Sequence, residues 1–141
     1  ILPYADAIEK SGYTEQEIVI MASIIEKEAS GDDDRSVVSG ILWKRIRIGM
    51  ALQVDATFSY LLGKTSSQLT LGDLQTDSPY NTYTNLGLPP GAIGNPGILS
   101  IEAALFPTES PYLYYLHDEH GTIHYAKDFE EHKRNKSLYL N

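Results

Sequence analysis

The sequence predicts an α+β fold: one helix-dominated domain with a small antiparallel sheet near the C-terminus and a long Pro/Gly/Asn-rich loop that borders a groove. Three observations carry this prediction. Apolar residues recur at helical spacing over the first third of the chain, residues 76–97 contain few periodic apolar positions, and short alternating segments flank a turn at residues 118–121. With 141 residues, 42% of them hydrophobic, the chain is long enough for one core.

The first long helix is expected from about Glu15 to Ser30. Thr14 and Glu17 form the Thr-x-x-Glu pattern of a capping box, and Gly31 ends the helix. Apolar residues cover most of its circumference. We therefore predict a helix that is buried on most sides.

A second helix is expected from about Asp34 to Ile48. An aspartate serves as its N-cap, Ile48 lies on its core face, and Gly49 is its C-terminal stop. Asp55 is a favourable cap for a short helix that Gly63 ends.

The remaining chain is expected to be less regular. Thr70 caps one further turn, and Ser100 caps a short helix that ends before Pro107. Between them lies the long loop, residues 76–97. A loop of that length in a compact domain is either functional or disordered.

The C-terminal part predicts a hairpin and a helix. Residues 112–117 and 122–125 alternate as strands do, around the turn at residues 118–121. Asp128 and Glu131 then have the spacing that opens a helix.

Composition excludes several kinds of function. The net charge of −8 argues against nucleic acid, because binding its backbone requires Lys and Arg. The chain has no cysteine, which excludes thiol chemistry and disulfides. No apolar run has the length of a membrane span, and no signal peptide opens the sequence. The aspartates at residues 32–34 lack the spacing of a calcium loop, and the four histidines do not converge, so no metal and no cofactor are expected.

Ten tyrosines stand against three phenylalanines. A tyrosine ring with its hydroxyl suits polar, ring-shaped ligands such as sugars. For Tyr112, Tyr114 and Tyr115 the favoured interpretation is that they line a strand.

Glu26 and Glu28 lie on the first long helix, about 200° apart around its axis, so they do not face each other. The helical neighbours of Glu26 are mostly small, whereas those of Glu28 are bulky. A carboxyl group among small residues leaves room for a ligand and little water, so desolvation should raise the pKa of Glu26 towards that of a general acid. From the helix alone, the commoner interpretation is that Glu26 and Glu28 are both solvated surface charges.

Several blocks of the sequence resemble the catalytic domain of the MltG (YceG-like) family of peptidoglycan-cleaving proteins. The first, at residues 21–28, resembles the catalytic helix of that family, and the others follow in family order over nearly the whole chain. The blocks are MASIIEKE at 21–28, RIRIGMALQVD at 45–55, SPYNTY at 78–83, GLPPGAI at 87–93, NPG at 95–97, PYLYY at 111–115 and EH at 131–132.

The resemblance implies an endolytic lytic transglycosylase, which cleaves the β-1,4 bond between N-acetylmuramic acid and N-acetylglucosamine without water. Glu26 would act first as acid on the glycosidic oxygen and then as base on the C6 hydroxyl, leaving a 1,6-anhydro end. The substrate's acetamido group can stabilise the oxocarbenium centre, so one carboxylate suffices. Two alternatives stand beside it: a non-catalytic peptidoglycan-binding module, and a hydrolase that uses Glu26 with Asp55.

The same resemblance implies a set of substrate-binding residues. Gln53, Asn81 and Tyr83 are expected to offer amides and a hydroxyl to the sugars, and Ser23 and Glu28 to border the groove from the catalytic helix. Asn81 has a competing interpretation, in which it ties the loop to itself.

Four further residues are left open. Asp55 either caps a helix or lines the groove. For Tyr80 and Thr82, neither contact with the sugars nor a purely structural role in the loop is favoured. His132 is a surface residue that matches the family pattern.

The resemblance also concerns the protein as a whole. Residues 1–141 are expected to form the catalytic domain, without the transmembrane helix and LysM-like region found N-terminal to it in the family. The full-length protein is expected to be extracytoplasmic and anchored to the cell membrane. Its expected partners are the glycan strands of peptidoglycan and the cell-wall synthesis machinery, with no nucleic acid.

Overall fold

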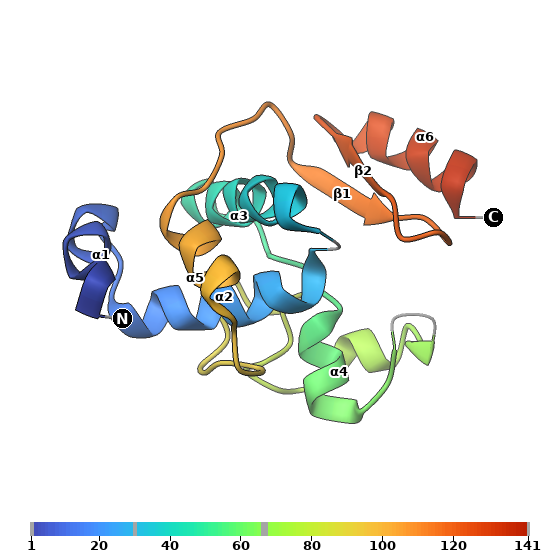
Figure 1. Ribbon diagram of the computed structural model, residues 1–141. Helices are drawn as coiled ribbons and strands as arrows, with labels where there is room; N and C mark the ends of the chain where they lie inside the picture. Colours follow the sequence, from blue (N-terminus) through green and yellow to red (C-terminus); the bar gives the residue numbers. More distant parts are fainter. Residues whose placement is uncertain (1, 30, 66–67, 141) are drawn as a thin grey trace.

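The computed structural model of the protein describes residues 2–29, 31–65 and 68–140 (Figure 1). Helices dominate, and one two-stranded sheet lies near the C-terminus, which confirms the predicted α+β class. The elements in chain order are η1 (Leu2–Tyr4), α1 (Ala5–Ser11), α2 (Glu15–Glu28), α3 (Asp32–Arg47), α4 (Ala56–Leu62), η3 (Asp73–Gln75), α5 (Ile98–Leu105), β1 (Tyr114–His117), β2 (Ile123–Ala126) and α6 (Phe129–Tyr139).

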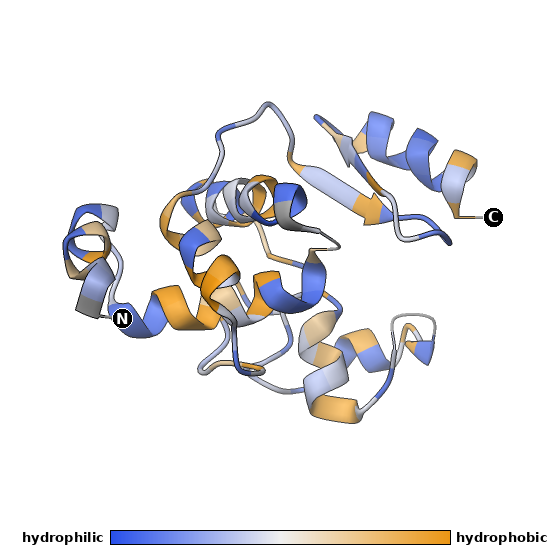
Figure 2. Cartoon of the chain, viewed as in Figure 1, coloured by the Kyte–Doolittle hydropathy of each residue, from blue (hydrophilic) through white to orange (hydrophobic). Residues whose placement is uncertain are grey.

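Helix α2 is the centre of the fold. The predicted capping box is present: Thr14 Oγ1 accepts from Glu17 N at 3.1 Å, and Glu17 Oε1 accepts from Thr14 N at 2.8 Å. Ile18, Met21 and Ile25 are fully buried. The helix packs against α3 and α5, and Figure 2 shows hydrophobic residues concentrated where α2 and α5 meet. The predicted burial of this helix on most sides is confirmed.

Helix α3 begins earlier than expected. Its N-cap is Gly31, and no side chain caps the helix, so the prediction of an aspartate N-cap is wrong. Asp33 and Asp34 lie instead in the first turn, where carboxylates complement the positive end of the helix dipole. The predicted core position of Ile48 is also wrong, because the helix ends at Arg47 and the Ile48 side chain is 58% exposed.

The C-terminal hairpin and helix are as predicted. Strands β1 and β2 are antiparallel, with Tyr114 opposite Ala126 and His117 opposite Ile123. Asp128 then caps α6 by accepting from Glu131 N at 2.9 Å. The hairpin and α6 pack on each other at one end of the molecule (Figure 1).

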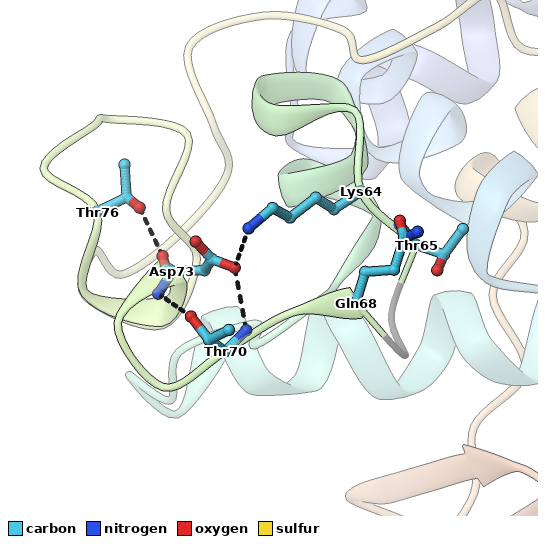
Figure 3. A network of polar contacts seen from close by, with 6 residues as sticks. All are labelled: Lys64, Thr65, Gln68, Thr70, Asp73 and Thr76. Atoms are coloured by element: carbon cyan, nitrogen blue, oxygen red, sulfur yellow. Dashed lines mark hydrogen bonds and ion pairs between the residues drawn. The ribbon is translucent and has the colours of Figure 1, made fainter.

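A polar network joins Lys64, just after α4, to residues 70–76, which lead into the long loop (Figure 3). Asp73 Oδ2 accepts from Lys64 Nζ at 2.8 Å and from Thr70 N at 3.0 Å. Thr70 Oγ1 in turn accepts from Asp73 N, and the expected turn after Thr70 is present as η3. The Lys64 bond is the main cause that holds the pKa of Asp73 below its ordinary value.

Residues 76–97 contain no helix or strand, as expected of the long loop. Within the described part of the chain, no helix has the length and apolar character needed to cross a membrane.

Candidate active site

A cleft of about 460 Å³ lies between the end of α2, the segment that leads into α4, and the hairpin with α6. Its lining combines polar groups with aromatic rings. The polar groups belong to Glu28, Arg45, Gln53, Asp55, Tyr83 and Tyr115, and further rings come from Tyr114, Phe129 and His132.

Glu28, the last residue of α2, is partly buried in this cleft. The Tyr115 hydroxyl donates to Glu28 Oε1 at 2.6 Å. Burial raises the pKa of Glu28 to about 7; the nearby charge of Asp55 adds to the rise, and the bond from Tyr115 opposes it. A carboxyl group with this pKa is partly protonated at neutral pH, which is the state a general acid needs.

Arg45 lines the cleft but is almost fully buried, and hydrogen bonds hold it in one position. Its Nε donates to Leu113 O at 2.9 Å, and its Nη1 donates to Leu52 O. The guanidinium lies over the rings of Tyr114 and Tyr115, 5.4 and 6.0 Å from their centroids. Its positive charge acts on Glu28 against the effect of burial.

Asp55 supplies a second carboxylate to the cleft. The Tyr83 hydroxyl donates to Asp55 Oδ1 at 2.8 Å, and the Asp55 side chain makes no capping bond to α4. Of its two interpretations, the structure therefore favours the groove-lining one. Burial, with Asp55 beside it, raises the pKa of Tyr83. The hydroxyl thus keeps its proton and remains a donor to Asp55.

Gln53 lies at the edge of the cleft with a positive φ of 54°, the one non-glycine residue with positive φ among those described. Its N–H donates to Thr82 O at 3.1 Å, which holds this conformation. Strained backbone of this kind is found most often at functional sites. The expected place of Gln53 in the groove is consistent with the geometry.

Glu26 lies away from the cleft. Its Oε1 accepts from Gly97 N at 2.9 Å and from Ser100 Oγ at 3.0 Å, so it caps the first turn of α5. These two bonds, that from Gly97 first, hold the pKa of Glu26 below its ordinary value. The expectation of a raised pKa is wrong, because the space left by its small neighbours is filled by α5.

This packing also corrects the predicted cap of α5. Gly97 is the N-cap, and Ser100 lies buried inside the helix. A Cβ atom at Gly97 would lie 3.3 Å from Glu26 Oε1, so glycine permits the close approach of the carboxylate.

Ser23 does not face the cleft. It is fully buried, where its Oγ donates to Ile20 O at 2.6 Å and accepts from Ile93 N at 3.1 Å. Ser23 therefore ties the long loop to α2, and its expected position at the groove is wrong.

Asn81 is also fully buried, and its amide is fully used. Nδ2 donates to Leu74 O and Thr76 O, both at 2.9 Å. Oδ1 accepts from Tyr83 N at 2.9 Å and from Thr84 N at 3.2 Å. Its expected place in the groove is wrong, and the competing interpretation, a residue that ties the loop to itself, is confirmed.

Thr82 and Tyr80, which the sequence left open, separate in the structure. Thr82 is buried and its Oγ1 accepts from Val54 N at 3.0 Å, so it supports the fold. Tyr80 is partly buried and its ring meets that of Tyr60, 5.2 Å away.

His132 lines the cleft and stacks on Tyr114, with ring centroids 4.9 Å apart. Burial lowers the pKa of His132 to about 4, assisted by the charges of Lys136 and Arg45, so the ring is neutral at pH 7. Its Nδ1 is buried without a hydrogen-bond partner in the described structure. The described residues contain no group of three or more His, Cys, Asp or Glu placed to hold a metal ion.

Arg45 and Tyr115 are residues of the cleft that sequence reasoning did not assign to it. Tyr115 was expected merely to line a strand, and the alternation that predicts the strand does not indicate which side chain meets α2. For Arg45 the signal is a single charge on an otherwise apolar face of α3.

An open cleft with a partly protonated glutamic acid, a second carboxylate and several aromatic rings is typical of carbohydrate-cleaving proteins. A model of the YceG-like family matches residues 3–137, and the chain belongs to this family.

Relatives in this family carry names that describe an activity. An endolytic murein transglycosylase of Bacillus subtilis (strain 168) is 39% identical over 137 residues, which is 97% of this chain and 38% of that protein. A protein of the same name from Streptococcus pneumoniae serotype 2 (strain D39) is 34% identical over 99% of this chain and 26% of its own length. The chain thus spans between about a quarter and two fifths of the length of these curated relatives.

The crystal structure of a yceG-like protein from Listeria monocytogenes has the same fold. It superposes with a TM-score of 0.88 and is 44% identical in sequence, over 95% of this chain and 44% of that one.

Proposed function

We propose that residues 1–141 form the catalytic domain of an endolytic murein transglycosylase in which Glu28, and not Glu26, is the acid and base. One observation carries the proposal: Glu28 presents a carboxyl group with a pKa of about 7 to an open cleft. The names of the relatives support the substrate, the glycan strands of peptidoglycan. A protein that acts on this substrate works outside the cytoplasm.

In the first step, protonated Glu28 gives its proton to the glycosidic oxygen between N-acetylmuramic acid and N-acetylglucosamine. The bond from C1 of muramic acid to this oxygen breaks, and N-acetylglucosamine leaves with a free 4-hydroxyl. Positive charge develops at C1, where the acetamido group of the same sugar stabilises it.

In the second step, Glu28, now a carboxylate, takes the proton of the C6 hydroxyl of muramic acid. The C6 oxygen then bonds to C1 and closes a 1,6-anhydro ring. No water is consumed, and Glu28 ends in its starting state. A pKa near the working pH suits a residue that acts first as an acid and then as a base.

The neighbouring residues have distinct roles in this mechanism. Tyr115 orients the carboxyl group and limits the rise of its pKa. Asp55, held by Tyr83, places a negative charge near the developing oxocarbenium. Gln53 offers an amide to the sugars at the rim.

A second candidate is a hydrolase that uses two carboxylates. Asp55 lies in the same cleft as Glu28, which favours this alternative, and it replaces the pairing of Asp55 with Glu26 that the sequence suggested. In a hydrolase, Asp55 would activate a water or attack C1, and the product would carry a reducing end.

Digestion of purified sacculi separates the two reactions. Mass spectrometry of the released glycans should show 1,6-anhydromuramyl ends, which are lighter than the hydrolytic products by one water. Reducing ends in place of anhydro ends would favour the hydrolase.

A further inference from the structure

A second groove, of about 330 Å³, meets the first cleft at Glu28. Glu28 lines both hollows, and the other residues of the second groove come from α2, α4 and the long loop: Lys27, Ala56, Ser59, Tyr60 and Ile93. If the scissile bond lies at Glu28, a long glycan strand must continue past this residue in both directions. The second groove adjoins Glu28 and offers room for such a strand.

Tyr60 presents a platform in this groove. Its side chain is 53% exposed, and the ring of Tyr80 braces it from the long loop at 5.2 Å with an angle of 36° between the planes. The backbone that follows Tyr80 is fixed, since Asn81 Nδ2 donates to Leu74 O and to Thr76 O. A braced, exposed ring offers a face on which a sugar ring can stack without further ordering.

Lys27 brings a positive charge to the same groove. Its side chain is exposed and makes no ion pair with any residue that the structure describes, in a chain with a net charge of −8. Its Cε lies 3.4 Å from where a Cβ of Gly94 would stand, so glycine leaves room for the lysine at the rim. An unpaired lysine beside a sugar platform fits a saccharide that carries carboxylates.

We propose that this second groove binds the glycan strand on one side of the scissile bond, with Tyr60 stacked on a sugar ring and Lys27 paired with a carboxylate of the strand. That carboxylate belongs to the peptide stem, because the lactyl carboxyl of muramic acid is joined to the stem as an amide. The proposal rests on the proposed function, because it places the scissile bond at Glu28. It makes the second groove the part of the site that distinguishes peptidoglycan from uncharged glycans of N-acetylglucosamine.

Binding measured in the Glu28→Gln background tests this, because the strand then stays intact. Tyr60→Ala should weaken the Kd for solubilised peptidoglycan strands by about three- to tenfold, whereas Tyr60→Phe, which keeps the ring, should leave it unchanged. Lys27→Gln should weaken it by about two- to fivefold at low salt, and the loss should vanish at 0.5 M salt. Lys10→Gln, an exposed lysine on α1, is the matched control and should have no effect.

Three ligands identify the carboxylate that pairs with Lys27: intact strands, strands without peptide stems, and a chitin oligosaccharide. If it belongs to the peptide stem, the effect of Lys27→Gln disappears when an amidase has removed the stems. An effect that persists on the stripped strands would instead assign the pair to the lactyl carboxylate that the amidase sets free. A chitin oligosaccharide, which has neither group, should bind equally well to Lys27→Gln and to its parent. An equal loss on chitin would overturn the role of Lys27, and an equal loss in Tyr60→Phe and Tyr60→Ala would overturn stacking.

The proposal can fail while the proposed function stands. In that case the wild-type protein releases anhydro ends and Glu28→Gln does not, but Tyr60→Ala and Lys27→Gln bind strands as tightly as their parent. If instead the wild-type protein releases no anhydro ends, the proposed function fails.

Discussion

The hydroxyl of Tyr115 lies 2.6 Å from Glu28 Oε1 and connects strand β1 to the last residue of α2, although 87 residues separate the two in sequence. This bond favours the charged form of Glu28, while burial favours the neutral form more strongly. The hairpin therefore lines the cleft, and through Tyr115 it also lowers the pKa of the glutamate that we propose as the acid.

Tyr115→Phe should shift the alkaline limb of the pH–rate profile to higher pH. The Tyr115 bond lowers the pKa of Glu28, so its loss raises that pKa and keeps the acid protonated over a wider range. The measurement is kcat/KM against pH on solubilised strands, with Tyr112→Phe, whose ring stacks on Tyr125 outside this bond, as the control. An unmoved alkaline limb would contradict the role given to Tyr115.

Glu28 should make the protein less stable as the pH rises from about 4.5 to 7. Its pKa is about 7 in the folded protein, above its ordinary value of 4.5, so the folded state holds more protons than the unfolded state in this window. The free energy of unfolding then falls with pH, by at most about 1.4 kcal/mol per pH unit from this group.

Chemical denaturation at pH 4.5 and pH 8 checks this. Glu28→Gln should remove this part of the pH dependence and be the more stable protein at pH 8. A Glu28→Gln protein with the same pH dependence as wild type would show that Glu28 titrates normally.

Asn81→Ala should destabilise the protein by about 3 kcal/mol, because it leaves buried backbone groups of the loop without partners. For a domain of this size that corresponds to roughly 10 °C in Tm. Activity should fall only with the folded fraction. The control is Asn95→Ala, an exposed asparagine of the same loop. Normal thermal stability with lost turnover would instead place Asn81 at the substrate.

Glu26→Ala should cost about 1 kcal/mol of stability through loss of the cap on α5, whereas Glu26→Gln should cost less because its amide oxygen still accepts from Gly97 and Ser100. The pKa of Glu26 is lowered in the folded protein, so its contribution is present above the ordinary pKa and is lost as the pH falls through the folded pKa. Thermal melts of both variants at pH 7 and pH 3 provide the check. Equal stability of Glu26→Ala and wild type at pH 7 would contradict the capping role.

Much of the fold was predictable because its signals are local. The capping box at Thr14, the turn before Thr122 and the cap at Asp128 depend only on residues close in sequence, and all three are present. Helix α1 was missed, since its seven residues, Ala5–Ser11, are too few to establish a periodic pattern.

The site was less predictable because it depends on packing between distant segments. Glu26 and Glu28 were correctly placed on opposite sides of α2, but the sequence does not reveal which side another element covers. Helix α5 covers the Glu26 side and converts a carboxylate among small residues into a helix cap. The hydrogen bonds of Asn81 were likewise not predictable, since its partners lie up to seven residues away in an irregular loop.

The central claim is that Glu28 is the acid and base. The most direct test is the rate at which Glu28→Gln and Glu26→Gln release 1,6-anhydromuramyl ends from purified sacculi, with folding checked by thermal melts. We predict that Glu28→Gln loses at least about a hundredfold in turnover, as expected for removal of a general acid, while Glu26→Gln stays within a few-fold of wild type. Full activity in Glu28→Gln, with loss in a folded Glu26→Gln, would contradict the account and return the catalytic role to Glu26.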